Sequence, residues 1–256
     1  MKKKLLIYIL VLIFLYFVGC INEMEMLEDN STLKAGNERL FMPDSLRDLI
    51  EYDRNSMDQY SIRKLENILE LLYTFPETNK MLNSLKDGLK VKMEITGGSS
   101  SLGEAWYDPI YPPKIGFLRE DCITMENVLH ELLHHYAMYN YVPYRDGVIP
   151  ACEEYEMRVL TDVIMQKYCA NCDFKYQGMS PDEGLFYQPY IDWINNLINT
   201  SSFDKFLFGI EFKKYGTICI MNLQYNDKTT HDILQINDLN YYIPLLLETF
   251  LFNFKR

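Results

Sequence analysis

The residues that most constrain this chain are His130-Glu131-Leu132-Leu133-His134, in which two histidines stand four positions apart. Apolar residues around them recur at spacings of three and four, which predicts a helix over residues 124–139. We expect Thr124 to be its N-cap. Residues four apart on a helix lie on the same side, one turn apart, so the two imidazoles can converge on one small volume.

Two convergent imidazoles beside a carboxylate suit a zinc hydrolase. We expect His130 and His134 to bind Zn²⁺. Glu131 is the expected general base, which takes a proton from a water molecule whose pKa the metal has lowered. The structural alternative is an ordinary helix whose histidines are satisfied by hydrogen bonds.

A tetrahedral zinc site needs a third protein ligand. The extended pattern HExxHxxGxxH is excluded, because the chain has Ala137 and Asn140 where glycine and histidine would be required. His135 points about 100° away from His134 around the helix, and His231 lies far along the chain. We therefore expect a carboxylate as the third ligand.

The next predicted helix, over residues 151–167, offers Glu153, Glu154 and Glu156. We choose Glu154 as the third ligand, because it lies on a helix face that could turn toward the first helix. Glu153 is the alternative. Asp162 is a candidate hydrogen-bond partner for a ligand histidine. The chosen face carries Glu154, Met157, Arg158 and Thr161.

Residues 124–167 resemble the gluzincin metallopeptidases, in which an HExxH helix is followed by a helix that donates a glutamate ligand. His130, Glu131 and His134 carry this resemblance. Some gluzincin families have the pattern ExxAD on the second helix. Aligning that pattern on the expected ligand places Met157 and Arg158 where alanine and aspartate would stand, so the register of the third ligand stays open.

In gluzincin-like families an edge strand just ahead of the HExxH helix pairs with an extended peptide substrate. By resemblance, residues 105–107 or 114–118 are expected to do this. Prolines at 109, 112 and 113 are typical of a sheet edge. A sheet edge that binds nothing is the alternative.

The remaining patterns predict an α+β fold, with a small sheet of three or four strands ahead of a mostly helical body. Strict alternation of apolar and polar residues over residues 90–95 predicts a half-buried strand. Residues 217–223 are ambiguous. Further helices are expected over residues 44–52, 56–73, 77–85, 180–200 (kinked at Pro189), 203–215 and 241–254.

The first 19 residues resemble a bacterial lipoprotein signal peptide. Lys2 to Lys4 precede an apolar run from Leu5 to Val18, which is too short to span a bilayer comfortably. Cleavage before Cys20 would leave this residue as the lipidated start of the mature chain. The protein would then be lipid-anchored at the bacterial cell envelope, outside the cytoplasm; an uncleaved N-terminal anchor is the alternative.

The polar, acidic residues 20–42 read as a flexible tether, and residues 43–256 as one zinc metallopeptidase-like domain. The net charge of −11 becomes −14 if the leader with its three lysines is removed. Such an acidic chain is a poor candidate for binding nucleic acid, whose phosphates need basic patches.

Two further sets of residues leave alternatives open. An oxyanion formed during hydrolysis could be stabilised by a tyrosine, arginine or histidine, and nothing singles one out among Tyr141, Tyr144, Arg145 and His231. Beyond Cys20 the cysteines are odd in number, namely Cys122, Cys152, Cys169, Cys172 and Cys219. Cys169 and Cys172 form a lone CxxC motif, for which a local disulfide, a redox pair and two free thiols are all open.

The sequence thus predicts an envelope-tethered, zinc-dependent metallopeptidase that hydrolyses peptide bonds in a peptide or protein substrate. One alternative is a non-catalytic surface binding lipoprotein that retains the zinc-site helix as a scaffold. Another is a toxin-like effector protease with a single protein target.

Overall fold

The computed structural model describes the greater part of the chain after residue 43. The predicted signal peptide (1–19) and tether (20–42) lie outside the described residues. The described part is mostly helical with one four-stranded mixed sheet, which confirms the predicted α+β class. None of its helices is long and apolar enough to cross a membrane. The described residues are 44–85, 90–97, 104–140, 151–169, 171–172, 174–199, 205–226 and 245–248.

The sheet has the strand order β1-β2-β4-β3, which comprises β1 (Ile50–Tyr52), β2 (Val91–Ile95), β4 (Lys114–Phe117) and β3 (Ala105–Asp108). Strand β2 pairs in parallel with β1 and β4, whereas β3 pairs antiparallel with β4. Of the two segments predicted at a sheet edge, only β3 is an outer strand. The prediction for residues 114–118 is wrong, because β4 is paired on both sides.

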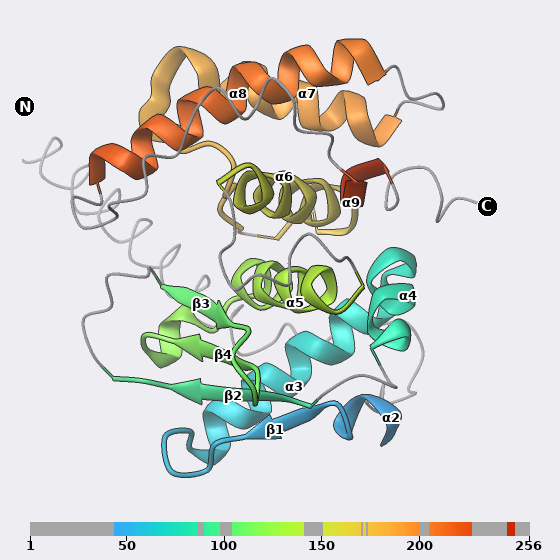
Figure 1. Cartoon of the computed structure of the whole chain (residues 1–256), viewed down its shortest axis with the longest axis vertical. Coiled ribbons are helices and arrows are strands. Elements are labelled where there is room, and N and C mark those ends of the chain that lie inside the picture. Colours follow the sequence, from blue (N-terminus) through green and yellow to red (C-terminus); the bar gives the residue numbers. More distant parts are fainter. Residues whose placement is uncertain are drawn as a thin grey trace, which may run out of the picture. The chain divides into compact units, whose positions relative to one another are not determined.

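Alternation along β2 follows the predicted half-buried pattern. Val91 and Met93 are fully buried, and the chain packs α3 (Gln59–Thr74) across that face of the sheet (Figure 1). Lys92 points the other way and forms an ion pair with Asp53 at 3.0 Å. The alternation therefore separates an apolar core from a charged outer face.

The helices ahead of β2 lie close to their predicted positions, with one correction. Helix α3 begins after Asp58, whose side chain accepts a hydrogen bond from the backbone N–H of Ser61. Helix α4 (Pro76–Ser84) starts with its proline at the first turn, where the missing N–H costs nothing. The predicted helix over residues 44–52 is wrong beyond α2 (Asp44–Arg47), because residues 50–52 form β1 and pair with β2.

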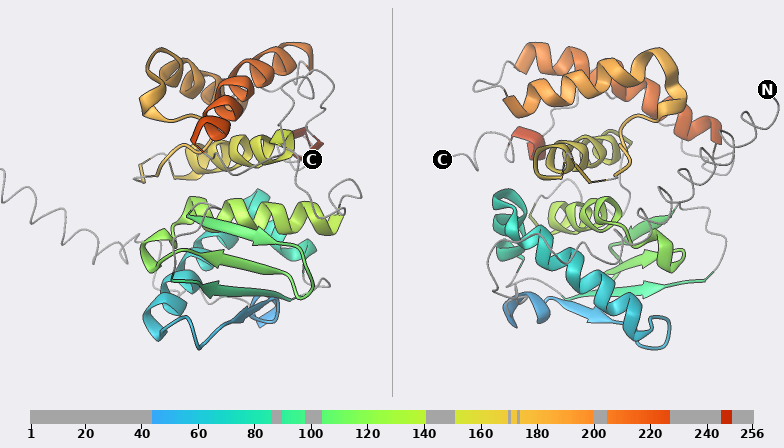
Figure 2. Two further views of the ribbon diagram at one scale, coloured as in Figure 1. Left: turned by 60° about the vertical axis from the view of Figure 1, so that its left-hand side comes forward. Right: turned by 180° about the vertical axis from the view of Figure 1, so that it is seen from behind.

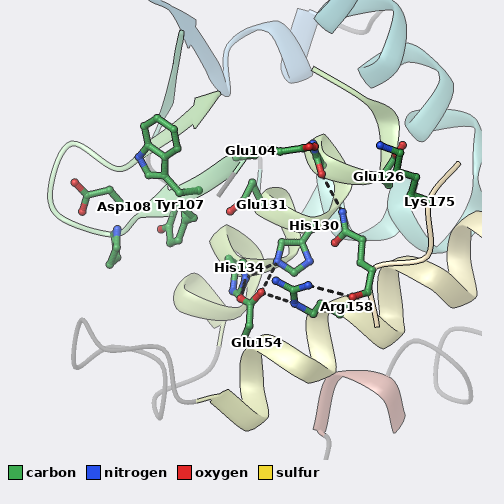
Figure 3. A pocket seen from close by; sticks show the side chains of 15 residues that line it. Glu104, Tyr107, Asp108, Glu126, His130, Glu131, His134, Glu154, Arg158 and Lys175 are labelled. Carbon is green, nitrogen blue, oxygen red and sulfur yellow. Dashed lines mark hydrogen bonds and ion pairs between the residues drawn. The ribbon is translucent and has the colours of Figure 1, made fainter. Parts of the chain in front are cut away.

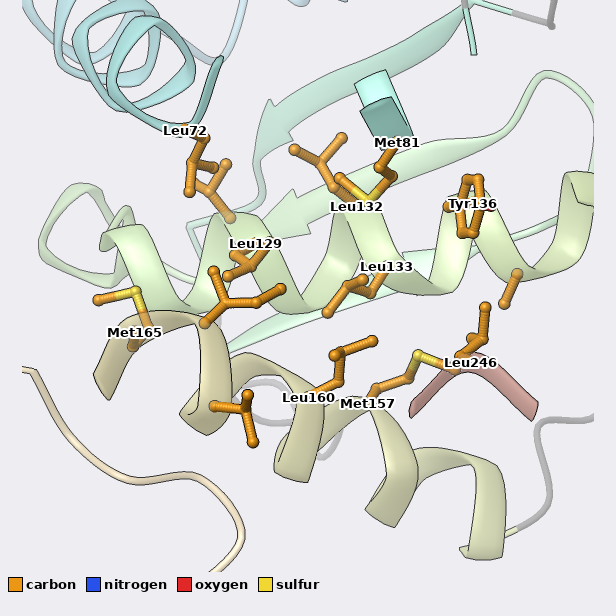
Figure 4. Packing of buried hydrophobic residues seen from close by; sticks show 14 of the residues in the cluster. Leu72, Met81, Leu129, Leu132, Leu133, Tyr136, Met157, Leu160, Met165 and Leu246 are labelled. Carbon is orange, nitrogen blue, oxygen red and sulfur yellow. The ribbon is translucent and has the colours of Figure 1, made fainter. Parts of the chain in front are cut away.

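Helices α5 (Met125–Asn140) and α6 (Ala151–Tyr168) lie against each other in the middle of the described part. Figure 4 shows Leu129 and Leu133 of α5 turned toward Met157 and Leu160 of α6, and all four are fully buried. Burying each such side chain stabilises the fold by about 1.5–3 kcal/mol before entropy is counted. This apolar contact holds the two predicted ligand helices at a defined separation.

The layers follow one another from the sheet to α5, then α6, then a pair formed by α7 (Tyr187–Asn199) and α8 (Lys205–Asn226) (Figures 1 and 2). The short 3₁₀ helix η1 (Glu120–Cys122) directly precedes α5 in the sequence. The short helix α9 (Leu245–Glu248) contacts α6. The chain thus places α5 between the sheet and the helical layers.

The helical layers correct one prediction and resolve one ambiguity. The segment after Ser180 starts as predicted, but it forms a 3₁₀ helix, η3 (Pro181–Phe186), and breaks at Gly184 (φ 56°, ψ −106°) rather than at Pro189. The left-handed φ is open to glycine and strained for other residues. Residues 217–223 are helical as part of α8. Of the predicted helix over 241–254, the described part is α9.

The CxxC motif is a local disulfide between Cys169 and Cys172, at the C-terminal end of α6. Cys122 and Cys219 are buried free thiols. The side chain of Cys152 lies outside what the structure describes. The disulfide closes the turn that leads from α6 into residues 174–179.

Candidate metal centre

The HExxH turn sits in the middle of α5, on a helix that starts as predicted. The Thr124 hydroxyl oxygen accepts a hydrogen bond from the backbone N–H of Asn127 at 3.3 Å, so Thr124 is the N-cap. One turn later, the Nε2 atoms of His130 and His134 lie 3.0 Å apart. Both side chains are buried, with 5% and 4% of their surface exposed. The two imidazoles therefore converge as the spacing predicted.

Glu154 of α6 completes the group. Its Oε1 lies 3.3 Å from Nε2 of His130, and its Oε2 lies 2.9 Å from Nε2 of His134. Figure 3 shows the three side chains pointing at one another across the gap between the helices. Their candidate ligand atoms all lie within 4.8 Å of one another, so this group could bind a metal ion.

The donor set and its spacing fit a tetrahedral metal site. Around an ion with metal–nitrogen distances of about 2.0–2.1 Å, neighbouring donor atoms lie about 3.3 Å apart. The three separations observed here are 2.9, 3.0 and 3.3 Å. Two imidazoles and one carboxylate leave a fourth position open, as catalytic sites do.

The alternative ligand, Glu153, does not join this group. It is buried, and burial raises its pKa to about 7. Its Oε2 atom has no hydrogen-bond partner among the described residues. Glu156 is fully buried and accepts a hydrogen bond from the backbone N–H of Leu247 at 2.9 Å. Successive residues on a helix are about 100° apart, and only Glu154 faces the imidazoles.

Glu131 lies in the wall of the same cavity as the two histidines. Only 5% of its surface is exposed. Burial raises the pKa of its carboxyl group to about 8, against the nearby positive charges of His134 and Arg158, which lower it. A carboxyl group with a pKa near neutrality can both accept and release protons in that range.

The two histidines differ in their electrostatic surroundings. Burial lowers the pKa of His130 to about 4, so its imidazole is neutral at neutral pH, as metal binding requires. Burial also lowers the pKa of His134, but the hydrogen bond and negative charge of Glu154 more than offset it, and this pKa is raised. A bound cation would replace the proton in that contact.

Asp162 does not contact a ligand histidine, which corrects the prediction. Its carboxylate accepts hydrogen bonds from the backbone N–H groups of Gln177 and Gly178 and from the hydroxyl of Tyr190. Burial raises its pKa to about 7, although these donors act to lower it. Within the described residues, the Nδ1 atoms of the two ligand histidines have no hydrogen-bond partner.

Arg158, expected only to share a helix face with Glu154, is itself part of the site. Its Nε donates to Oε1 of Glu154 at 2.8 Å, and its Nη1 donates to the backbone carbonyl of Gln177 at 3.1 Å. Although burial alone would raise it, the pKa of Glu154 is held well below its usual value by the charges of His130 and Arg158 and by hydrogen bonds from His130 and His134. The i, i+4 spacing from the chosen ligand could have identified Arg158.

A cavity of about 640 Å³ opens onto the metal-binding group. Strand β3 lines one side of it, and residues from α5, α6 and the segment after the disulfide line the other. The hydroxyl of Tyr107 on β3 lies 3.1 Å from Nδ1 of His135, which ties the strand to α5. The oxyanion candidates Tyr141, Tyr144, Arg145 and His231 all lie outside the described residues.

Comparison of this chain with protein-family models, curated proteins and solved structures gave no match. The resemblance to gluzincins therefore stays a prediction based on the HExxH turn and its companion glutamate.

Proposed function

We propose that this protein is a zinc-dependent metallopeptidase. The observation that carries the proposal is the convergence of His130, His134 and Glu154 from two helices onto one point in the wall of an open cavity. Glu131 stands in the same wall. Two imidazoles, one ligand carboxylate and one further carboxylate form the combination that water-based hydrolysis at zinc requires.

The residues would divide the work as follows. His130, His134 and Glu154 hold the ion, and Arg158 orients Glu154 through the 2.8 Å hydrogen bond. Bound Zn²⁺ would supply a Lewis acid and lower the pKa of water to about 7. Glu131 accepts the proton of the attacking water on a carboxylate oxygen and later donates a proton to the leaving amine nitrogen.

The position of β3 favours a peptide over other hydrolysable substrates. Among the described residues, this strand pairs with β4 on one side only, and all four of its residues, 105 to 108, line the cavity. An extended peptide can add to such a free edge through backbone hydrogen bonds. Its carbonyl groups would then lie along the cavity that leads to the metal-binding group.

We further propose that the protein acts at the bacterial cell envelope, held by lipid on Cys20. The proposal rests on the basic and apolar leader that ends at this cysteine. Replacing it, Cys20→Ala, should release the protein from the membrane fraction without changing its activity. Retention of the variant in membranes would favour an uncleaved N-terminal anchor.

The function is tested with Glu131→Gln, which removes the proton-accepting group and leaves the three metal ligands in place. The variant should keep its metal and lose about 10²- to 10⁴-fold in peptide hydrolysis. The matched control is Glu126→Gln, on the same helix and lining the same cavity, which should hydrolyse peptides as the wild type does. Equal activity of wild type and Glu131→Gln would contradict the mechanism.

A diverse peptide library, scored for newly formed termini, tests the class of substrate. Cleavage of many unrelated sequences supports a general peptidase and excludes an effector with one target. Metal binding without any new termini would favour a single protein target or a non-catalytic binding lipoprotein. Screening proteins of the envelope for cleavage then separates these two.

A further inference from the structure

We propose that Gln177 is a positioning residue that braces the two ligand helices against each other, an inference that rests on the proposed function. Gln177 lies in the segment after the Cys169–Cys172 disulfide, outside both helices. Its side-chain Nε2 donates to Oδ1 of Asn127 on α5 at 3.0 Å. Its backbone carbonyl accepts from Nη1 of Arg158 on α6 at 3.1 Å.

Both contacts lie within one helical turn of a ligand. Asn127 precedes His130 by three residues on α5, and Arg158 follows Glu154 by four residues on α6. Arg158 also donates to Glu154 directly. A continuous chain of hydrogen bonds therefore runs from the imidazole-bearing helix through Gln177 to the third ligand.

The brace is fixed in place from behind by Asp162. Its two carboxylate oxygens accept from the backbone N–H groups of Gln177 at 2.8 Å and of Gly178 at 2.9 Å. Tyr190 donates to the same carboxylate at 2.6 Å. A Cβ atom at position 178 would lie 2.2 Å from the Tyr190 hydroxyl, so only glycine permits this approach.

Asn127 is held as well, because its Nδ2 donates to the backbone carbonyl of Cys122 at 3.0 Å. This contact orients the amide so that Oδ1 faces Gln177. Both ends of the brace are therefore ordered before any ion binds. Groups that orient metal ligands in this way typically change metal affinity by 10- to 100-fold when removed.

The test measures zinc affinity by competition with a chelator, and the absorption spectrum of the Co²⁺-substituted protein. Gln177→Ala keeps both backbone contacts and removes only the contact to Asn127. We expect its Kd for Zn²⁺ to rise about 10- to 100-fold, with an altered Co²⁺ spectrum. Asn127→Ala should have the same effect, and the double variant should be no weaker than either single one.

The matched control is Gln188→Ala on α7, which removes an exposed contact to Asp192. It should bind Zn²⁺ as the wild type does. The thermal unfolding midpoint of each metal-free variant shows whether the fold is retained. If Gln177→Ala fails to fold, Asn127→Ala tests the same hydrogen bond from its other end.

The outcomes separate this inference from the proposed function. Unchanged Zn²⁺ affinity and Co²⁺ spectra in Gln177→Ala and Asn127→Ala overturn the brace and leave the peptidase proposal standing. Weakened Zn²⁺ affinity in both variants supports the brace. If the wild type also binds Zn²⁺ fully but hydrolyses no peptide or protein, the result counts against the peptidase. A wild-type protein that binds no metal overturns both.

Discussion

Helices α5 and α6 both face the candidate metal centre, but they use their buried polar residues differently. On α5 these residues lie within six consecutive positions, and on α6 they are distributed over most of the helix. The buried polar residues of α5 are His130, Glu131, His134 and His135, and those of α6 are Glu153, Glu156, Thr161 and Asp162. The first set is concentrated where chemistry is expected.

Two of the buried polar residues of α6 connect other segments to the helix. Glu156 holds the backbone of α9 at Leu247, and Asp162 holds the segment at Gln177. Lys167 reaches Glu77 of α4 at 2.5 Å. The comparison suggests that changes in the polar residues of α5 alter function at little cost to stability, whereas changes in those of α6 destabilise the fold.

The largest effect is expected for His134→Gln on α5. Loss of one of three ligands should abolish stoichiometric metal binding, measured by metal analysis of the purified protein. The free energy of unfolding of the metal-free protein should fall by only about 1 kcal/mol, because glutamine keeps a polar group of similar size. His135→Gln, which faces Tyr107 instead, is the control and should keep its metal. Equal metal content in the two variants would contradict the assignment of His134, rather than His135, as a metal ligand.

The opposite pattern is expected for Asp162→Ala on α6. The substitution leaves the hydroxyl of Tyr190 and the N–H groups of Gln177 and Gly178 without their acceptor. Chemical denaturation should show a loss of about 3 kcal/mol or more. The control is Asp192→Ala on an exposed part of α7, with an expected change within about 0.5 kcal/mol. A loss of similar size in both variants would mean that α6 is not the connecting helix.

Removing the disulfide with the double variant Cys169→Ser and Cys172→Ser tests the segment that α6 leads into. The closed loop is short, so the entropic loss should be about 2 kcal/mol in denaturant unfolding. Zinc affinity should fall less than in Gln177→Ala, because Asp162 still holds the segment. An affinity loss larger than that of Gln177→Ala would place the main restraint at the disulfide.

The smallest effect concerns the contact of α6 with α4. Burial acts to raise the pKa of Glu77, but hydrogen bonds from Lys167 and Tyr168 lower it below the usual 4.5. Because this pKa is lower in the folded state, the contribution to stability is complete above about pH 4.5 and is lost as the pH falls through the folded-state value. Glu77→Gln should reduce stability by about 1 kcal/mol at pH 7 and flatten its decline in acid. If the variant loses stability with falling pH as steeply as the wild type does, the lowered pKa of Glu77 would be contradicted.

Local patterns predicted the parts of the fold that depend on local chemistry. The strand at Val91–Ile95, the cap at Thr124 and the HExxH helix all follow from spacing within a few residues. Residues 50–52 were predicted as helix, because their strand state depends on pairing with β2, some forty residues later. The predicted kink at Pro189 is wrong, because the break lies at Gly184.

The candidate site was predictable to a similar degree. The grouping of Glu154 with both imidazoles follows from the helix face, and the structure brings these three residues together. Gln177 carried no local signal, because its contacts to Asn127 and Arg158 join segments 50 and 19 residues away. The predicted contact between Asp162 and a ligand histidine is wrong, because sequence position cannot show which hydrogen-bond donors lie near a buried carboxylate.

Because β3 is short, it could pair with only a short stretch of a bound peptide. Its four residues span about 13 Å, and Pro109 directly after them has no N–H to offer. Alternate side chains of a paired peptide would point to the same side as Tyr107, toward α5. Recognition along this edge would therefore depend on a motif of about four residues. Two side chains of this motif would contact the protein, and the rest of the peptide sequence could vary.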